Sequence, residues 1–289
     1  MSECMLCPRK CGADRENGEK GACSVGSALK IARIAPHYWE EPCISGVNGS
    51  GTVFFSGCPL RCVYCQNQEI NGGAVGKEYT VDELAMELKR LEASGVHNVN
   101  FVTPTHYTPQ IVSALKKARL TIPVVYNCGG YELPKTLALL KGLVQIYLPD
   151  FKYSNSETAQ KYSFAADYPQ VALSAIDCML RQVGEPVFDV DGMMKSGVIV
   201  RHLVLPNHID ESMKAIRMLH ERYGNKIYIS IMNQYTPMPN VKIKELSRPV
   251  SEDEYSLVLD YAEHLGIVNA FIQEGGTASE SFIPPFSSN

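Results

Sequence analysis

The sequence predicts an α/β fold: a partial (β/α)6 barrel of the TIM-like kind with a small Cys-rich amino-terminal lobe. Three observations lead to this expectation. From Gly51 onward, six short β-rich runs alternate with helical patterns, which implies a parallel sheet with right-handed crossovers. The runs are mostly apolar without alternation, as in strands covered on both faces. Residues 1 to about 50 lie outside this pattern and are rich in cysteine and glycine.

The expected elements follow one another along the chain in the order strand, then helix. Six units are fewer than the eight of a closed barrel, so the barrel is expected to be partial. We expect strands at 52–56, 98–103, 124–126, 143–148, 198–205 and 227–232, with 269–273 as a last short strand, and helices at 80–95, 108–118, 134–140, 156–162, 170–181, 210–223 and 251–265.

Helix starts are marked by side chains that satisfy free backbone N–H groups. Thr80 with Glu83, and Ser251 with Glu254, each form a capping box. Thr108 is the expected N-cap of a further helix, with a proline in the first helical position. In the helix that Thr80 opens, the apolar residues share one face and Gly95 ends the helix; they are Val81, Leu84, Ala85, Leu88 and Leu91.

Composition and charge narrow the classes of function. Lys and Arg total 27 against 31 Asp and Glu, a net charge of −4 with no basic stripe, so nucleic acid is not expected as a partner. No apolar run approaches the roughly 20 residues of a membrane helix, and the first residues lack a signal-peptide core. We therefore expect a cytoplasmic protein with no membrane partner, in which clustered thiols are reduced and bind metal or take part in catalysis.

The placement of the cysteines suggests three segments. Eight of the ten cysteines fall in the first 65 of 289 residues. We expect a Cys-rich lobe at 1–50, the barrel at 51–275 and a tail at 276–289. No glycine pair forms a phosphate-binding fingerprint, so nucleoside triphosphate chemistry is not expected.

Three cysteines stand directly after the first expected strand. Cys58, Cys62 and Cys65 are spaced C-x3-C-x2-C, which lets one loop wrap an iron–sulfur cluster. Because a [4Fe-4S] cluster has four irons, three local thiolates leave one iron with an open position for a substrate or cofactor. The alternatives are structural zinc, which prefers four closed ligands, and buried inert thiols.

Four earlier cysteines form a candidate second metal site. Cys4, Cys7, Cys11 and Cys23 are spaced C-x2-C-x3-C-x11-C among turn-forming residues. They suit a closed zinc site or a second iron–sulfur cluster, because a segment so poor in apolar residues needs a metal to order it. Zinc is slightly favoured, since four closed thiolates need no redox partner; free cysteines in a loose arm are the alternative. Cys43 is a candidate extra ligand, whereas Cys128 and Cys178 are expected to be ordinary buried thiols.

Polar residues follow the later strands at the edge where barrel active sites lie. Each has an ordinary structural explanation, such as a helix cap, a surface ion pair or a core histidine. Because all of them stand at the same edge of the predicted barrel, a functional site is favoured. They are Thr103, Thr105 and His106; Asn127 and Cys128; Asp150 and Lys152; Arg201 and His202; and Asn233 and Gln234.

The motif Cys58, Cys62, Tyr64 and Cys65 resembles the signature of radical S-adenosylmethionine (SAM) enzymes, and its context Gly-Cys-Pro-Leu-Arg-Cys-Val-Tyr-Cys-Gln-Asn is similar to the pyruvate formate-lyase activating enzymes. The whole chain most resembles an activating-enzyme-related branch. The resemblance implies that SAM chelates the open iron and that one electron from the reduced cluster cleaves it to methionine and a 5′-deoxyadenosyl radical. It also implies a one-electron reductant such as flavodoxin or ferredoxin.

The resemblance further implies where SAM binds. Related enzymes carry Gly-Gly-Glu after the second strand, where this chain has Thr103-Pro104-Thr105. Asp150 and Lys152 are similar to the family's Asp-x-Lys pair, Arg201 matches a family arginine, and Gln234 replaces a histidine. The resemblance does not assign a catalytic side chain to this sequence. The candidate SAM contacts are Tyr64, Thr103, Thr105, Asn127, Asp150, Lys152, Arg201 and Gln234.

Three functions are compatible with these features. The first is an activase that takes a hydrogen atom from a glycyl residue of a partner enzyme. The second is a radical SAM enzyme that modifies another peptide or a small molecule. The third is a non-catalytic iron–sulfur or zinc module. Production of 5′-deoxyadenosine from SAM distinguishes the enzymes from the module.

Overall fold

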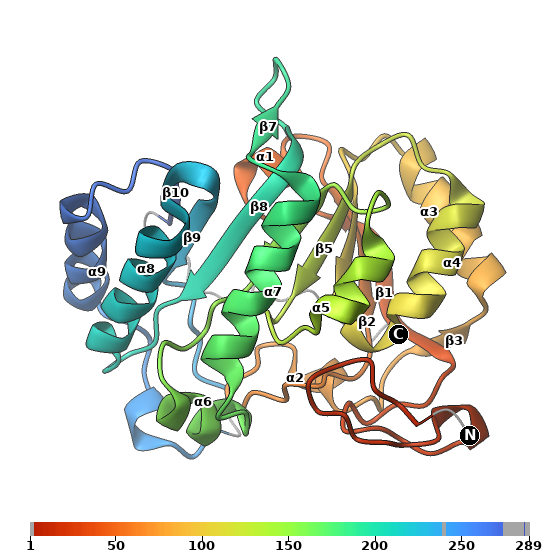
Figure 1. The fold of residues 1–289 in the computed structure, drawn as a ribbon, viewed down its shortest axis with the longest axis horizontal. Helices are drawn as coiled ribbons and strands as arrows, with labels where there is room; N and C mark the ends of the chain where they lie inside the picture. Colours follow the sequence, from red (N-terminus) through yellow and green to blue (C-terminus); the bar gives the residue numbers. More distant parts are fainter. Residues whose placement is uncertain (1–2, 239–240, 274–285, 287–289) are drawn as a thin grey trace.

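An open sheet of parallel strands flanked by helices forms the body of the protein (Figure 1). The computed structural model describes residues 3–238, 241–273 and 286. The parallel strands lie in the order β10-β9-β8-β6-β5-β4-β2, which confirms the expected partial barrel and its last short strand. Their bounds are Ser50–Phe55 (β2), Val99–Val102 (β4), Val124–Cys128 (β5), Ile146–Pro149 (β6), Met194–Leu203 (β8), Tyr228–Met232 (β9) and Ala270–Ile272 (β10).

Two antiparallel strands that the sequence analysis did not predict extend this sheet at the β2 edge. β1 (Leu29–His37) pairs with β2 on one side and with β3 (Lys77–Tyr79) on the other. Buried Leu29 and Ile31 alternate with partly exposed Lys30, which is the pattern of a strand near a sheet edge. The boundary expected at residue 50 therefore does not coincide with the edge of the sheet. A short β7 (Val187–Phe188) pairs with the start of β8.

One face of the sheet is covered by a row of helices (Figure 1). Phe101 and Tyr126 are fully buried in the sheet and pack in one apolar core with Leu88, Ile176 and other helix residues. The covering helices are α3 (Val81–Ala93), α4 (Thr108–Ala118), α5 (Pro134–Leu137), α7 (Tyr168–Val183), α8 (Ile209–Tyr223) and α9 (Glu252–His264). This burial explains why the strands read as apolar runs.

The helix caps agree with the sequence at two positions and differ at one. Capping boxes are present at Thr80 with Glu83 and at Ser251 with Glu254. The prediction that Thr108 is an N-cap is wrong. The turn of 3-10 helix at Thr105–Tyr107 runs directly into α4, so Thr108 already has helical geometry and its hydroxyl donates back to the Thr105 carbonyl at 3.0 Å.

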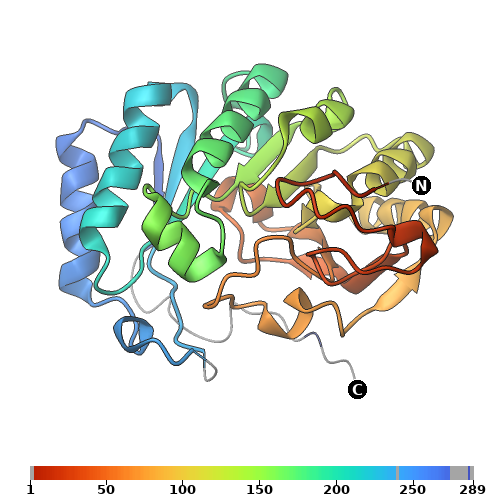
Figure 2. The same cartoon turned by 60° about the horizontal axis from the view of Figure 1, so that its bottom comes forward.

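The carboxyl ends of β5 and β8 point to the bottom of Figure 1, where the amino-terminal segment, α2 (Gln68–Asn71) and α6 (Ser156–Ser163) gather. Figure 2 brings this edge forward. The short helix α1 (Pro42–Ser45) lies on the inner face of the sheet, the face opposite to the row of covering helices. Its Cys43 is packed in an apolar cluster with Val125 and Ile146, which removes it from the candidate metal ligands.

Two further observations concern the ends of the chain and its hydropathy. The expected tail at 276–289 lies outside the described residues except for Phe286, whose ring packs on Phe54 with centroids 5.3 Å apart. Among the helices that the structure describes, none has the length and apolar character needed to cross a membrane.

Candidate active site

Cys58, Cys62 and Cys65 lie on the loop that joins β2 to α2, and all three line one cavity of about 510 Å³. The loop leaves the strand at Gly57, which has a φ of +84°. A Cβ at Gly57 would lie 2.6 Å from the Cys23 carbonyl oxygen, so only glycine allows the chain to pass here. The same carbonyl accepts the Cys58 N–H at 3.2 Å. The amino-terminal segment thus sets the path of the cysteine loop.

The three cysteines of this loop are partly buried. Burial raises the pKa of Cys58 to about 11, while the backbone N–H groups of Arg61 and Leu60 act in the opposite direction. Burial also raises the pKa of Cys65 to about 12 against a backbone hydrogen bond from Asn67. Thiols that face one cavity and accept N–H donors are a donor set that fits an iron–sulfur cluster.

Tyr64 anchors the loop to the barrel interior. Its hydroxyl accepts a hydrogen bond from Tyr153 at 2.8 Å, and Tyr153 in turn pairs with the Ser163 hydroxyl at 2.7 Å. Ser163 donates to Cys62 Sγ at 2.9 Å. A continuous buried network therefore connects Tyr64 to one of the three cysteines, which gives the tyrosine of the motif a positioning role.

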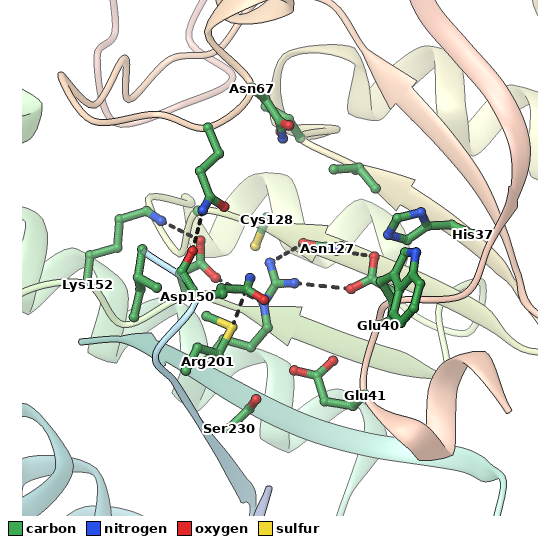
Figure 3. Close-up of a pocket in the computed structure, with 18 of the residues that line it drawn as sticks. His37, Glu40, Glu41, Asn67, Asn127, Cys128, Asp150, Lys152, Arg201 and Ser230 are labelled. Atoms are coloured by element: carbon green, nitrogen blue, oxygen red, sulfur yellow. Dashed lines mark hydrogen bonds and ion pairs between the residues drawn. The ribbon is translucent and has the colours of Figure 1, made fainter. Parts of the chain in front are cut away.

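A chain of charged side chains crosses the cavity beside the cysteine loop (Figure 3). Lys152 Nζ lies 2.5 Å from Asp150 Oδ2, and Arg201 Nε lies 3.1 Å from Asp150 Oδ1. Arg201 Nη1 continues to Glu40 Oε2 at 3.2 Å. Asn127 bridges the last pair, because its Oδ1 accepts from Arg201 at 2.5 Å and its Nδ2 donates to Glu40 at 3.1 Å.

The pKa values of these groups follow from burial and pairing. Burial alone would raise the pKa of Asp150, but Lys152 and Arg201 outweigh it and lower that pKa. Burial alone would lower the pKa of Lys152, yet Asp150 holds it well above its usual value. Asp150 is therefore an ionised carboxylate between two cations. Glu40 differs, because burial raises its pKa in spite of Arg201.

Two acidic residues of the site were missed by the sequence analysis. Glu40 and Glu41 follow β1 and extend across the inner face of the sheet, where both line the cavity. Figure 3 shows Glu41 between Ser230 and Glu40. The Glu41 side chain is only 8% exposed, and its Oε2 has no hydrogen-bond partner among the described residues. The sequence signal was two adjacent glutamates after Trp39, without strand context to place them.

Seven of the eight predicted SAM contacts line the cavity, although SAM contact itself stays a prediction. Thr105 is the exception, because it lies beneath the cavity wall with 2% exposure and donates to Glu132 Oε1 at 2.5 Å. Burial raises the pKa of Glu132 to about 8, against hydrogen bonds from Thr105 and Tyr126. The lining residues are Tyr64, Thr103, Asn127, Asp150, Lys152, Arg201 and Gln234.

The remaining polar residues at the strand ends have mainly structural contacts. His106 Nε2 lies 2.8 Å from the Ser56 carbonyl, and His202 Nδ1 lies 2.7 Å from the Phe151 carbonyl; both rings are buried outside the cavity lining. The Gln234 carbonyl accepts the Gln66 side chain at 2.6 Å, which connects the end of β9 to the cysteine loop. Cys128 is buried, as expected, and lines the cavity. The expectation that Cys178 is also buried is wrong, because its side chain is partly exposed.

No three His, Cys, Asp or Glu side chains within residues 3–238, 241–273 and 286 are gathered closely enough to hold a metal ion as they stand. This applies equally to Cys58, Cys62 and Cys65 and to the four amino-terminal cysteines. All ten cysteines are free thiols. The fit of a cluster at the loop therefore depends on its donor set and on the cavity that it faces.

Comparison with known proteins gives a family match over most of the barrel. The model of the radical SAM superfamily matches residues 52–248. An uncharacterised protein of Methanocaldococcus jannaschii is 29% identical over 273 residues, which cover 91% of this chain and 75% of that protein. The pyruvate formate-lyase-activating enzyme of Clostridium pasteurianum is 47% identical over 49 residues, which cover 16% of this chain and 21% of that enzyme.

Solved structures agree on the fold. Streptococcus suis SuiB bound to its precursor peptide SuiA has a TM-score of 0.54 at 12% identity, over 75% of this chain and 46% of that one. Methylornithine synthase (PylB) has a TM-score of 0.51 at 15% identity, over 79% of this chain and 74% of that one. The chain thus spans about half the length of SuiB and three quarters of PylB.

Proposed function

Because the chain belongs to the radical SAM superfamily, we propose that it cleaves SAM reductively at a [4Fe-4S] cluster held by Cys58, Cys62 and Cys65. We further propose that it acts as an activase, taking a hydrogen atom from a glycyl residue of a partner enzyme. When bound, the reduced cluster supplies one electron to the sulfonium, so that SAM becomes methionine and a 5′-deoxyadenosyl radical, which becomes 5′-deoxyadenosine on taking the hydrogen atom.

One observation carries this proposal: the three cysteines of the loop open onto the same cavity as the charged chain from Lys152 to Glu40. Lys152 lines the same cavity as Cys58 and Cys62. A fixed ammonium beside the cluster ligands suits the carboxylate of SAM. Asp150 keeps that ammonium in place, and the walls of the cavity exclude water from a radical.

The far wall of the cavity suits a substrate with hydrogen-bonding groups. Burial raises the pKa of Glu41, and its Oε2 is buried without a partner among the described residues, which is costly to leave unsatisfied. A peptide backbone offers both N–H donors and C=O acceptors. The similarity to a pyruvate formate-lyase-activating enzyme, and the fold shared with SuiB bound to the precursor peptide SuiA, support a peptide or protein substrate.

The test is anaerobic reconstitution with iron and sulfide, followed by dithionite and SAM. We expect 5′-deoxyadenosine from the wild type and from Cys178→Ala, a matched change of a thiol outside the cavity lining. Cys62→Ala should lose both the cluster absorbance and the product. Continued SAM cleavage by Cys62→Ala would refute the cluster assignment, and an intact cluster without SAM cleavage would favour a non-catalytic module.

The activase role needs a second measurement. The reconstituted protein is incubated with a glycyl radical enzyme from the same organism, with flavodoxin or ferredoxin as the reductant. A glycyl radical signal in electron paramagnetic resonance supports the activase. SAM cleavage without that signal favours the second candidate, modification of another peptide or a small molecule.

A further inference from the structure

Turns of the backbone bring the four amino-terminal cysteines, spread over twenty residues, into one small lobe, although among the described residues no three of them are close enough to hold a metal ion as they stand. Backbone hydrogen bonds pair Cys4 with Gly12 and Ala13, at 3.2 and 3.1 Å, which brings Cys4 beside Cys11. A Cβ at Gly21 would lie 3.3 Å from Sγ of both Cys11 and Cys23, so Gly21 leaves room for two sulfurs to approach.

The remaining thiol, Cys7, belongs to the same group. It is buried, and its carbonyl accepts the Lys10 N–H at 3.0 Å in the turn that leads to Cys11. Arg15 adds a buried guanidinium, whose Nη1 lies 3.9 Å from Cys4 Sγ. Arg15 thus places a fixed positive charge at the edge of this group of sulfurs.

The segment has almost no apolar core that could order it instead. Among residues 3–28, the buried side chains are Cys7, Cys23, Val25 and Arg15, so two of the three buried apolar residues are themselves cysteines. The only helical element there is the single 3-10 turn Arg15–Asn17. A lobe of this size normally depends on a metal or on disulfides, and these thiols are free.

We propose that Cys4, Cys7, Cys11 and Cys23 form a closed tetrathiolate zinc site that fixes the amino-terminal lobe against the catalytic cysteine loop. Zinc suits this group because four thiolates complete its tetrahedral shell and leave no open position. Metal binding displaces the thiol protons and draws the sulfurs together. The site lies apart from the SAM cavity, whose lining includes none of the four cysteines.

The lobe makes direct contacts through which the site acts on the catalytic loop. The Cys23 carbonyl accepts the Cys58 N–H at 3.2 Å. Arg9, between two of the proposed ligands, donates to the carbonyls of Pro59 at 2.8 Å and Leu60 at 3.2 Å. Loss of zinc should therefore loosen the loop that carries Cys58, as a positioning effect rather than a catalytic one.

The experiment measures metal on the full chain, independently of SAM cleavage. The triple variant Cys58→Ala, Cys62→Ala, Cys65→Ala should contain no stoichiometric iron and about one zinc per chain. Adding Cys4→Ser and Cys11→Ser should remove the zinc, whereas adding Cys178→Ser should leave it. X-ray absorption at the zinc edge of the wild-type protein should show four sulfurs at about 2.3 Å, a readout that does not depend on any variant folding.

Each other outcome overturns the proposal. Iron kept by the triple variant would mean a second cluster, and neither metal would mean free thiols. Zinc with nitrogen or oxygen neighbours, or zinc kept after Cys4→Ser and Cys11→Ser, would mean adventitious binding. Because zinc is measured without SAM or reductant, failure here is distinct from failure of the proposed function.

Discussion

Gly130 fixes the distance between the loop after β5 and the carboxylate that holds Lys152. Its φ is +76°, and a Cβ at this position would lie 2.1 Å from the Asp150 carbonyl oxygen. Tyr168 OH lies 2.8 Å from this carbonyl oxygen and 2.9 Å from the Gly129 carbonyl oxygen, so the two acceptors share its one hydrogen. Hydrogen bonds at the cavity wall therefore hold Gly130 and the Asp150 carbonyl close together.

The substitution Gly130→Ala should destabilise the protein through two separable effects. A left-handed φ costs alanine about 1 kcal/mol. The overlap with a backbone oxygen adds about 1–3 kcal/mol, because Asp150 has to move away by roughly 1 Å to reach ordinary contact. Gly142→Ala is the matched control: its φ is +77°, and nothing lies within 4 Å of its Cβ. Gly142→Ala should therefore lose only the roughly 1 kcal/mol that comes from the left-handed φ.

Urea unfolding of the cluster-free proteins measures this difference in the free energy of unfolding. We expect the free energy of unfolding of Gly130→Ala to be about 1–3 kcal/mol lower than that of Gly142→Ala. Reconstituted Gly130→Ala should also bind SAM about tenfold more weakly, since the displaced Asp150 no longer orients Lys152. Equal destabilisation of the two variants would refute the argument that contact with Asp150 requires glycine at position 130.

Three further predictions test the site and its surroundings. Asp150→Asn should weaken SAM binding about tenfold, which is about 1.4 kcal/mol of binding free energy, while the iron content stays unchanged. Loss of the cluster instead would mean that Asp150 has a structural role. Glu132 should make stability fall with rising pH between about 4.5 and its folded pKa of about 8, because the unfolded carboxyl ionises first while the folded one keeps its proton. Glu132→Gln should flatten this dependence of the melting temperature, and an identical slope in both proteins would contradict the assignment. Arg9→Lys should lower the free energy of unfolding by about 1–2 kcal/mol, and the reconstituted variant should contain less iron. The reason is that an ammonium group cannot donate to the Pro59 and Leu60 carbonyls together, as the forked guanidinium does. Unchanged stability and iron content would show that the Arg9 contacts do not hold the lobe.

The helices, most strands and the cysteine loop could be predicted because their signals are local. The capping boxes at Thr80 and Ser251 involve residues three apart, and the motif of Cys58, Cys62 and Cys65 spans eight residues. β1 was not predicted, because its partners lie elsewhere in the chain and its residues read as part of the cysteine-rich segment. Thr108 was misassigned as a cap, because the preceding turn that makes it helical has no sequence signature of its own.

The sequence by itself predicted a site built from thiolates, and it determined which family the chain resembles and at which strand ends the polar residues stand. Only the tertiary structure decided which of these residues share a cavity. Glu40 reaches Arg201 across 161 residues, and Thr105 turns away to Glu132 although its neighbour Thr103 lines the cavity. The reason is physical: spacing along the chain specifies local bonds, whereas the pairing of buried charges depends on sheet register and on which face each side chain takes.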